Sequence, residues 1–437
     1  MTEHVVPGIL DDASRGQSTV RSNKVSQPVA NVGPLKLPGF KSHGARQVEA
    51  GALRNVLAYV GVTAPHTGEP FSEELLFGLG GGIGLGYFVY QMPSFASLFL
   101  ATRITTEESA RPGFVLSMCE RLGVKVDLQH SSNAAVAEKK LKEALAQGQP
   151  VMVWIDPSHL PYYGRWLYAY HTLVVYGIED DRDEVYVADR PKKPLVLTRA
   201  ELSAARQGEG ASKFRALPLV APKPITKAGL QRAVKQGIHD CCDQMLNGFG
   251  PANFRSNFGL SALQKWADLL TDEKDKRGWP RYFPAGAHLY RALLAVFEQI
   301  ENRGGGSAFR PMYADFLVEA GVILQKSLDE AADRFRGSAR LWGKLSDAVL
   351  PNSVSNFKEA KQLATKRRTL FEKKGAAALD EIRAIDMRLS EIASQAGESF
   401  PLGNAEVRDL LAGLRERVLA IHAAEEKAVA ALRAAVH

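Results

Sequence analysis

The sequence predicts an α+β protein in which helices come first, an antiparallel sheet follows, and a long all-helical region completes the chain. Three observations carry this prediction. Apolar residues recur three and four positions apart between Glu49 and Gly61. Runs rich in β-branched and aromatic residues gather between Val151 and Asp189. From Leu230 onward, strand signals almost vanish.

The first part of the chain divides into an arm, a helix and a glycine-rich stretch. Residues 1–40 are rich in Ser, Pro, Gly, Asn and Val without a helical period, which predicts an extended or partly disordered arm. The helix that starts near Glu49 ends at Gly61. No charged residue falls between Glu74 and Arg103, but the many glycines interrupt this stretch. We therefore expect buried loop and core there, and no membrane-spanning helix.

The sheet follows two helices. The segments 110–130 and 134–156 each predict a helix and then a strand, the second strand being VMVWI. Two further strands, HTLVVYGIE and EVYVAD, are joined by the acidic turn 180–183. We place the boundaries of this domain at residues 41–220.

Helical spacing separated by Gly and Pro breaks predicts an all-helical domain over residues 221–352. Residues 353–437 form the last predicted unit, a helical hairpin or coiled-coil tail suited to packing or to a homo-oligomer. It carries two apolar stripes: Leu379, Ile382, Ile385, Leu389 and Ile392, then Val407, Leu411, Leu414, Val418 and Ile421.

Composition limits the classes of partner. The 437 residues carry a net charge of +7, a modest excess for this length that favours acidic partners. The densest basic run lies at 366–374 in helical sequence, where a solvated helix face is expected. No reader motif accompanies that run, so nucleic acid is not a predicted partner.

Cysteine and histidine usage points to a cytoplasmic protein without a metal site or cofactor. Three cysteines are too few for a disulfide framework, and the adjacent Cys241 and Cys242 cannot pair with each other, which fits a reducing compartment. The N-terminal sequence lacks the apolar core of a signal peptide. His159, His171 and His239 have no second ligand at metal-binding spacing.

One constellation has catalytic character. It combines the helix start at 47–61 with His171, which opens one strand, and Asp189, which ends the next. A cysteine at a helix N-terminus has its thiolate favoured by the helix dipole, while a His moves its proton and an Asp fixes the imidazole tautomer. A buried, satisfied His and a turn carboxylate remain the alternative interpretation.

The flanking residues carry a resemblance. HTLVVYGIEDDRDEVYVAD resembles the His and Asp strands of the peptidase domain that processes bacteriocin leaders, and QVEAGALRNVLAYVG aligns with the cysteine helix of that family without a gap. Together with FSEELLFGLGGGIGLGY, this helix also resembles the N-terminal domain of the butirosin-biosynthesis protein H family. The helix of that family opens with His-Cys-Glu, and its next block reads Ser-Glu and then Phe-Gly-Leu-Gly-Gly-Gly.

The second half resembles the helical domain of unknown function that commonly follows this N-terminal domain. IENRGGGSAFRPMYADFLVEA and ARLWGKLSDAVLP carry that resemblance. Together the resemblances imply a papain-like cysteine-hydrolase or acyltransferase fold at 41–220. They also imply transfer of an acyl group from a carrier-protein thioester to an amine, with an acyl carrier protein or a peptide as the partner.

The chain departs from the family pattern where the nucleophile should stand. Gln47 replaces the usual His and Val48 replaces the Cys, while Glu49 keeps the acid. Valine has no nucleophilic atom, and loss of a nucleophile removes most covalent catalysis. The place of the usual oxyanion Gln is Ser42. If the site is otherwise kept, the His171 ring should lie within hydrogen-bond reach of Asp189 and face Val48.

Two glycine-rich turns are candidate substrate or anion sites. Gly80, Gly81 and Gly82 have backbones that can approach a phosphate, although a tight loop against the cysteine-site helix is the favoured interpretation. Arg303 and Arg310 flank a second glycine turn and are the best anion candidates in the second half, where a simple helix-linking turn is the alternative.

Three hypotheses follow. The first is a family member that has lost cysteine catalysis and serves as a binding or scaffold protein for an acyl or peptidyl substrate. The second is an active acyltransferase or amidase that uses another group, such as Ser42, Glu49 or a water, with His171 as base. The third is a structural assembly protein that acts through its C-terminal helices.

Overall fold

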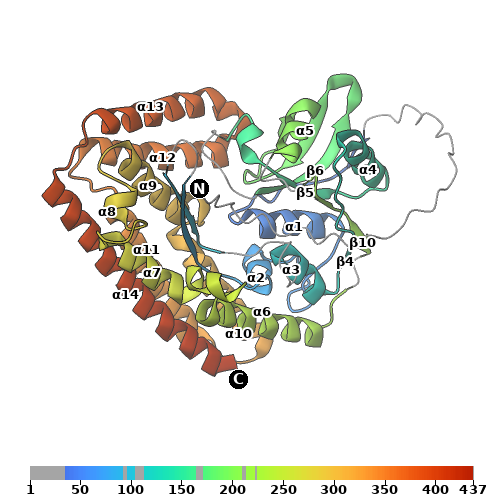
Figure 1. The fold of residues 1–437 in the computed structure, drawn as a ribbon. Coiled ribbons are helices and arrows are strands. Elements are labelled where there is room, and N and C mark those ends of the chain that lie inside the picture. The colour runs from blue at the N-terminus through green and yellow to red at the C-terminus, as the bar shows by residue number, and fades with distance from the viewer. Residues whose placement is uncertain are drawn as a thin grey trace, which may run out of the picture.

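The computed structural model describes residues 35–91, 96–103, 113–163, 171–208, 213–221 and 224–436. It confirms the α+β class: an α/β region spans residues 35–221, and a helical region spans residues 224–436. In Figure 1 most of the α/β region lies on the right-hand side, α7 to α9 and α11 to α14 lie on the left-hand side, and α6 and α10 lie at the lower centre beneath α2. Of the predicted N-terminal arm, residues 1–34 lie outside the described residues, and Leu35–Lys36 form a short strand, β1.

The main sheet is antiparallel, with the strand order β8-β7-β6-β5-β9, and β1 also pairs with β6. Its strands are β5 (Val151–Ile155), β6 (His171–Glu179), β7 (Glu184–Ala188), β8 (Leu195–Leu197) and β9 (Ala216–Leu217). The predicted strands at VMVWI, HTLVVYGIE and EVYVAD are therefore present. All residues of β5 are buried, as its apolar, β-branched sequence favours. A small second pair joins β4 (Lys125–Val126) to β10 (Leu219–Ala221).

Five helices accompany the sheet within the described part of the α/β region, and local capping fixes where several of them begin. They are α1 (Val48–Tyr59), α2 (Glu73–Leu79), α3 (Phe114–Leu122), α4 (Ala134–Ala146) and α5 (Arg199–Gln207). Gln47, Ser72 and Asn133 accept backbone N–H groups at the starts of α1, α2 and α4. Thr198 and Glu201 form a capping box at α5. α1 packs mainly on β6 and also contacts β5.

The glycine-rich stretch contains a β-hairpin that the sequence analysis missed. β2 (Gly86–Gln91) pairs antiparallel with β3 (Ala96–Ala101), where only buried loop and core were expected. The hairpin is stabilised by partners remote in the chain, since Tyr87 accepts a hydrogen bond from Trp279 (2.8 Å) and Phe88 packs edge-on against Phe258. The core character of the stretch is correct, but its extended backbone depends on the helical region.

The helical region consists of the predicted helices joined by short turns. They are α6 (Lys227–Asn247), α7 (Gly259–Thr271), α8 (Trp279–Tyr282), α9 (Ala287–Phe297), α10 (Arg310–Leu324), α11 (Asp329–Val349), α12 (Ser355–Lys374), α13 (Leu379–Glu398) and α14 (Asn404–Val436). A π-helical segment at Glu298–Arg303 follows α9. No helix among the described residues is long and apolar enough to cross a membrane.

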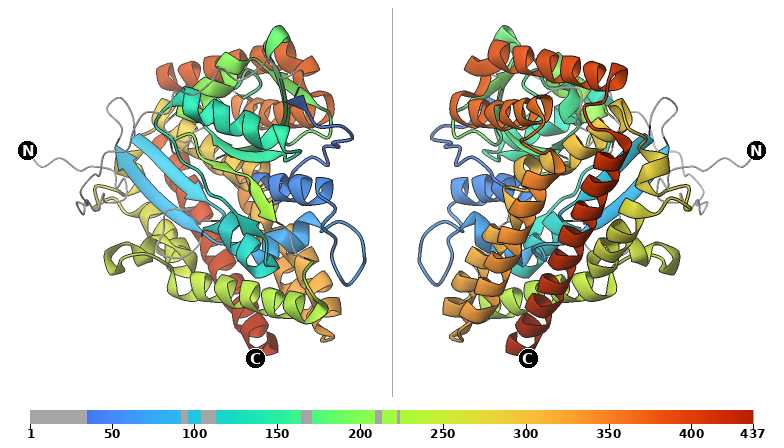
Figure 2. Two further views of the ribbon diagram at one scale, coloured as in Figure 1. Left: turned by 90° about the vertical axis from the view of Figure 1, so that its right-hand side faces the viewer. Right: turned by 90° about the vertical axis from the view of Figure 1, so that its left-hand side faces the viewer.

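The C-terminal helices form, but their arrangement corrects the predicted hairpin. α13 packs on α12 and α9, whereas α14 packs on α11, α7 and α6. Figure 2 shows α14 running across the helical region, away from α13. Leu389 and Ile392 of α13, and Leu414 and Val418 of α14, are buried inside the chain. The predicted homo-oligomer stays a prediction, and it would need a surface other than these buried stripe residues.

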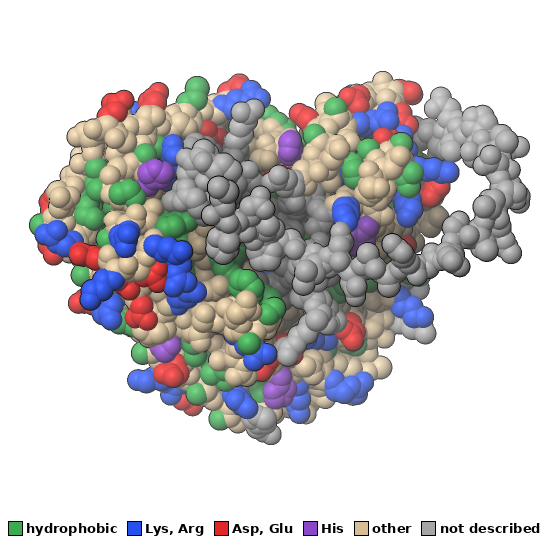
Figure 3. All heavy atoms as spheres, in the orientation of Figure 1, with side chains coloured by type: hydrophobic (Ala, Val, Ile, Leu, Met, Phe, Trp, Pro, Cys, Tyr) green, Lys and Arg blue, Asp and Glu red, His purple; other side chains and the backbone are tan. Residues whose placement is uncertain are grey.

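Charged side chains of both signs lie interspersed on the face of the molecule shown in Figure 3. The net charge of +7 is therefore not gathered into one basic patch among the side chains drawn there. This distribution agrees with the prediction that the net positive charge is a modest excess.

Candidate functional site

The start of α1 places Val48 at its first residue. The Gln47 side chain caps the helix, with Oε1 accepting a hydrogen bond from the Ala50 N–H (2.6 Å). Val48 is half-buried. Glu49 is buried, accepts a hydrogen bond from Gln47 Nε2 (3.1 Å) and forms an ion pair with Arg103. Its carboxylate is thus held inside the structure.

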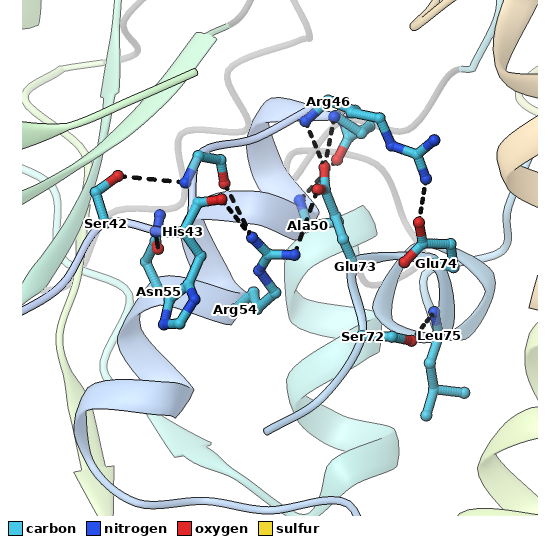
Figure 4. Close-up of polar contacts among 12 residues, drawn as sticks. Ser42, His43, Arg46, Ala50, Arg54, Asn55, Ser72, Glu73, Glu74 and Leu75 are labelled. Atoms are coloured by element: carbon cyan, nitrogen blue, oxygen red, sulfur yellow. Dashed lines mark hydrogen bonds and ion pairs between the residues drawn. The ribbon is translucent and has the colours of Figure 1, made fainter. Parts of the chain in front are cut away.

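A buried carboxylate, Glu73, fixes the loop that leads into α1 (Figure 4). Its Oε1 accepts the backbone N–H groups of Arg46 and Gln47, each at 2.7 Å, and Arg54 Nη1 lies 3.8 Å from Oε2. Burial raises the pKa of Glu73, and the N–H donors and the nearby guanidinium groups oppose that shift. The sequence analysis did not name Glu73. The Ser-Glu pair of the family block was the signal that could have identified it.

Arg54 and Asn55, from the second turn of α1, also hold this loop (Figure 4). Arg54 donates to the His43 carbonyl (2.7 Å), and Asn55 Oδ1 accepts the His43 N–H (2.8 Å). The loop before the helix is therefore bonded to the side of the helix that it precedes. The backbone at residues 46–48 is fixed by side chains from two helices.

The same loop is bonded to the sheet directly after Asp189. Ser42 Oγ donates to the Pro191 carbonyl (3.0 Å), and the Ala45 N–H donates to the Arg190 carbonyl (3.1 Å). These bonds bring the start of α1 next to the end of β7, as the constellation requires. They also occupy the Ser42 hydroxyl proton, so Ser42 does not present a free donor for an oxyanion.

His171 and Asp189 form the predicted hydrogen bond. His171 is the first residue of β6, Asp189 follows β7 directly, and the distance from Nε2 to Oδ1 is 2.9 Å. Their side chains are 8% and 0% exposed. The Arg190 N–H donates to the same carboxylate oxygen at 2.7 Å. The other ring nitrogen of His171, Nδ1, has no hydrogen-bond partner among the described residues. The predicted approach of Val48 to this ring stays a prediction.

Three aromatic residues that sequence reasoning missed surround this pair. The Tyr163 ring lies edge-on to His171 at 5.0 Å, and the Tyr162 and Tyr163 hydroxyl groups are each 3.5 Å from Asp189. Burial and the Asp189 carboxylate raise the pKa of both tyrosines. Phe371 of α12 stacks on Tyr162 at 4.8 Å. No motif marks these residues, and Phe371 comes from the helical region.

The three glycines proposed as an anion cradle are buried in a packed turn. The N–H groups of Gly80, Gly81 and Gly82 donate to carbonyl groups of the preceding helix at 3.0 Å. A Cβ at Gly80 would meet the Phe114 ring at 2.3 Å, and one at Gly82 would meet the Tyr313 ring at 2.3 Å. With the donors used and the space filled, these contacts support the tight-loop interpretation.

Arg310 is fully buried and bonded to protein groups. Its Nε and Nη2 donate to the two carboxylate oxygens of Glu425 at 2.7 and 2.9 Å, and Nη1 donates to the Ala308 carbonyl at 2.7 Å. Burial lowers the pKa of Arg303 to about 10, while Glu298 opposes that shift. The bonding of Arg310 supports a structural role for the turn between these arginines.

The native thiols lie away from the start of α1. Cys119 is on α3, Cys241 and Cys242 are on α6, and all three are buried and free of disulfides. Burial raises the pKa of Cys241 and raises that of Cys242 to about 11, which keeps both thiols protonated near neutral pH. No cluster of metal-ligating side chains occurs in the described ranges.

Two family models match the chain in succession. Residues 47–190 match the model described as Butirosin biosynthesis protein H, N-terminal. Residues 200–379 match the model described as a domain of unknown function, DUF4872. No match was found among the curated proteins. The first match begins at the cap of α1 and ends one residue after Asp189, so it contains both parts of the candidate site.

Proposed function

Because the chain belongs to the family of the butirosin biosynthesis protein H N-terminal domain, followed by DUF4872, we propose that it is a non-catalytic binding or scaffold protein for an acyl or peptidyl substrate. An acyl carrier protein or a peptide is the partner that this proposal requires. A papain-like arrangement of α1 against β6 is part of the same proposal, and the contact between these two elements supports it.

The carrying observation is Val48 at the first residue of α1, in a chain that retains the His171–Asp189 pair. The family resemblance puts the nucleophilic cysteine at this position. A valine there supplies an apolar contact and no nucleophile. The helix start still offers its N-terminal dipole, which favours a carbonyl oxygen or an anionic group of a bound substrate.

The other candidate nucleophiles near α1 are occupied. Ser42 donates its hydroxyl proton to the Pro191 carbonyl, and Glu49 is paired with Arg103. An activated nucleophile needs an adjacent base to take its proton, and in the described part of the chain neither group forms a hydrogen bond or ion pair with His171. This supports binding over covalent catalysis.

The retained pair favours one alternative, in which His171 activates a water for amide or thioester hydrolysis. Asp189 holds Nε2, which leaves Nδ1 as the nitrogen able to accept a proton. In the binding proposal, the same nitrogen accepts or donates one hydrogen bond to the substrate. The two functions differ in turnover and agree in their dependence on His171.

The test measures binding and turnover on the same samples. The wild-type protein and the His171→Ala variant are incubated with an acylated carrier protein and, separately, with a fluorescent peptide. Binding is followed by anisotropy, and thioester cleavage by release of free thiol. We expect binding that is weakened in the variant, without cleavage above the buffer rate. Cleavage by the wild type that His171→Ala abolishes would establish the hydrolytic alternative. If the wild type bound neither the carrier protein nor the peptide, the proposal would be overturned.

A further inference from the structure

We infer a second site, a binding site for a small oxyanion, in the hollow between α4, α5 and the far ends of β6 and β7. The oxyanion is a carboxylate or phosphate group, and Arg206 is the residue that binds it. This site is independent of the function proposed for Val48 and His171.

The hollow is lined by apolar and polar side chains in comparable measure. Leu141, Ile178 and Val185 belong to the wall, and the polar side chains that line it are Glu138, Arg199, Ser203 and Arg206. The space that these side chains border is about 340 Å³, and this figure includes open solvent, so the enclosed part is smaller. A hollow that combines apolar and polar side chains is the arrangement in which small ligands are commonly held.

Arg206 is buried in this hollow without an acidic partner. It is 3% exposed, and its Nη2 donates a hydrogen bond to the Phe214 carbonyl at 2.9 Å. Its Nε is enclosed and has no hydrogen-bond partner. No carboxylate among the described residues lies within ion-pair distance of its guanidinium group. Burial lowers the pKa of Arg206 to about 10, and Glu138 only partly opposes that shift.

The other charges of the hollow balance one another. Glu138 Oε1 forms ion pairs with Lys142 (3.0 Å) and Arg199 (2.6 Å). The same two cations lie 2.7 and 3.4 Å from Asp180. Two acidic and two basic side chains thus neutralise each other at the surface. Among the described residues, the positive charge of Arg206 is left without an ion-pair partner.

A bound oxyanion would supply both the missing negative charge and the missing hydrogen-bond acceptor for Arg206. Buried charges in proteins are normally paired, and a buried donor left without an acceptor is costly. The planar guanidinium group presents parallel N–H donors that match the two oxygens of a carboxylate or phosphate. An oxygen that accepts from Nε satisfies the enclosed donor, and its charge neutralises Arg206. The Ser203 hydroxyl lines the same hollow and adds one hydrogen-bonding group.

The two sites use opposite ends of the same strand pair. His171 opens β6, and Ile178 lies seven residues later, near the end of that strand. Seven residues of extended strand cover about 23 Å. The two sites therefore lie far apart, and substitution of Arg206 assigns an anion response to one of them.

The experiment compares thermal unfolding of the full chain in sodium phosphate, acetate and chloride at one ionic strength. A ligand that binds only the folded state raises the melting temperature in a saturable way. We expect phosphate, acetate or both to raise it on the order of 2 °C. The anion that acts identifies the ligand class, and chloride should have no comparable effect. Isothermal titration of the effective anion should give a saturable signal.

Arg206→Met and Arg206→Lys test the residue. Methionine keeps the apolar volume and removes the unpaired charge, so this variant should melt no lower than the wild type without ligand, and the anion response should vanish. Lysine keeps the positive charge but lacks Nε and the paired N–H donors of the guanidinium group. The Arg206→Lys substitution should therefore weaken anion binding at least about tenfold. Arg367→Met is the control, because Arg367 pairs with Glu298 and Asp386 elsewhere and its loss should leave the response intact.

Three results would overturn the inference: no anion-dependent rise in the wild type, an equal rise in chloride, or a rise that persists in Arg206→Met. If Arg206→Met does not fold, the titration of the Arg206→Lys variant decides, and unchanged affinity there would count against the site.

Discussion

Two buried acid–base pairs, Arg310–Glu425 and His171–Asp189, differ in how completely the protein satisfies them. Glu425 accepts both arms of Arg310 and also accepts from Ser338 (2.8 Å) and Trp342 (2.7 Å). The remaining Arg310 donors reach backbone carbonyls. In the other pair, Asp189 holds Nε2 of His171 while Nδ1 has no partner among the described residues.

This difference suits the first pair to a structural role and leaves the second pair able to bind a ligand. A buried polar network whose members are all bonded to one another has nothing left to offer a ligand, and it acts by fixing one packing arrangement. A pair that keeps one unbonded ring nitrogen can still bind or exchange a proton. Arg310, His171 and Asp189 were site candidates in the sequence, and the hydrogen-bonding capacity that each pair leaves unused distinguishes the two pairs.

The largest expected effect is on the satisfied network. Arg310→Met leaves Glu425 charged and buried without its main partner, so it should lower the free energy of unfolding by about 3–5 kcal/mol. Urea denaturation measures the change. Arg334→Met is the control, because its exposed pair with Glu330 should contribute at most about 0.5 kcal/mol.

A double variant sharpens this prediction. Arg310→Met combined with Glu425→Leu removes both charges, so much of the lost stability should return. If the double variant were as unstable as the sum of the two single variants, the pair would not act as a coupled network.

The next largest effect concerns the unsatisfied pair. Val48→Cys puts a thiol at the start of α1, where the helix dipole lowers a thiol pKa and where the predicted approach of His171 would lower it further. We expect residue 48 to react with iodoacetamide at pH 7 about tenfold faster than free cysteine, because a pKa lower by about one unit gives that much more thiolate. Mass spectrometry reads the label at residue 48.

His171→Ala in the Val48→Cys background is the matched test. It should remove most of the rate advantage while the fold is kept, as circular dichroism can verify. Equal labelling rates with and without His171 would mean that the ring does not face the start of α1. The His171–Asp189 pair would then have no functional role at this site.

A smaller effect is expected from Glu73, which supports the start of α1. Its folded pKa is raised above its ordinary value of 4.5, so the folded chain binds more protons than the unfolded chain in that window. Stability contributed by this group should therefore fall as the pH rises from 4.5 through the folded pKa. Glu73→Gln should flatten that part of the curve of unfolding free energy against pH. An unchanged slope would show that Glu73 titrates normally.

The smallest expected effect is none. Cys119, Cys241 and Cys242 are buried, so thiol alkylation of the native protein should leave substrate binding unchanged. Labelling should become complete only in denaturant, which a mass shift can follow. Loss of substrate binding on modification of one of these thiols would contradict this prediction, because it would show that a cysteine takes part in binding.

The sequence predicted those features that depend on local pattern. The helix at α1, the strands β5 to β7 and the His171–Asp189 bond follow from periodicity and from a motif whose parts share one domain. The amphipathic stripes of α13 and α14 predicted buried faces correctly, but a stripe does not encode what will cover it. This is why the predicted hairpin was wrong while its helices were right.

Features that depend on distant partners could not be predicted. Arg310 lies beside a glycine turn, which resembles an anion site until Glu425, 115 residues away, is placed on it. The β2–β3 hairpin and Phe371 beside Tyr162 likewise need contacts between the α/β and helical regions. The Ser-Glu pair of the family block marks Glu73 in the sequence, but its hydrogen bonds with the Arg46 and Gln47 amides depend on the fold.

The meeting of α2 and α6 constrains how the two matched domains can be inherited. A Cβ at Gly237 of α6 would lie 2.4 Å from the Gly78 carbonyl oxygen of α2, and a Cβ at Gly78 would strike the Phe316 ring at 2.2 Å. The helical region therefore packs against α2 so closely that it constrains the position of α2. Glu73, which fixes the start of α1, belongs to α2. Exchange of the C-terminal domain by recombination would preserve the first site only if the incoming first helix also brought a glycine to this crossing.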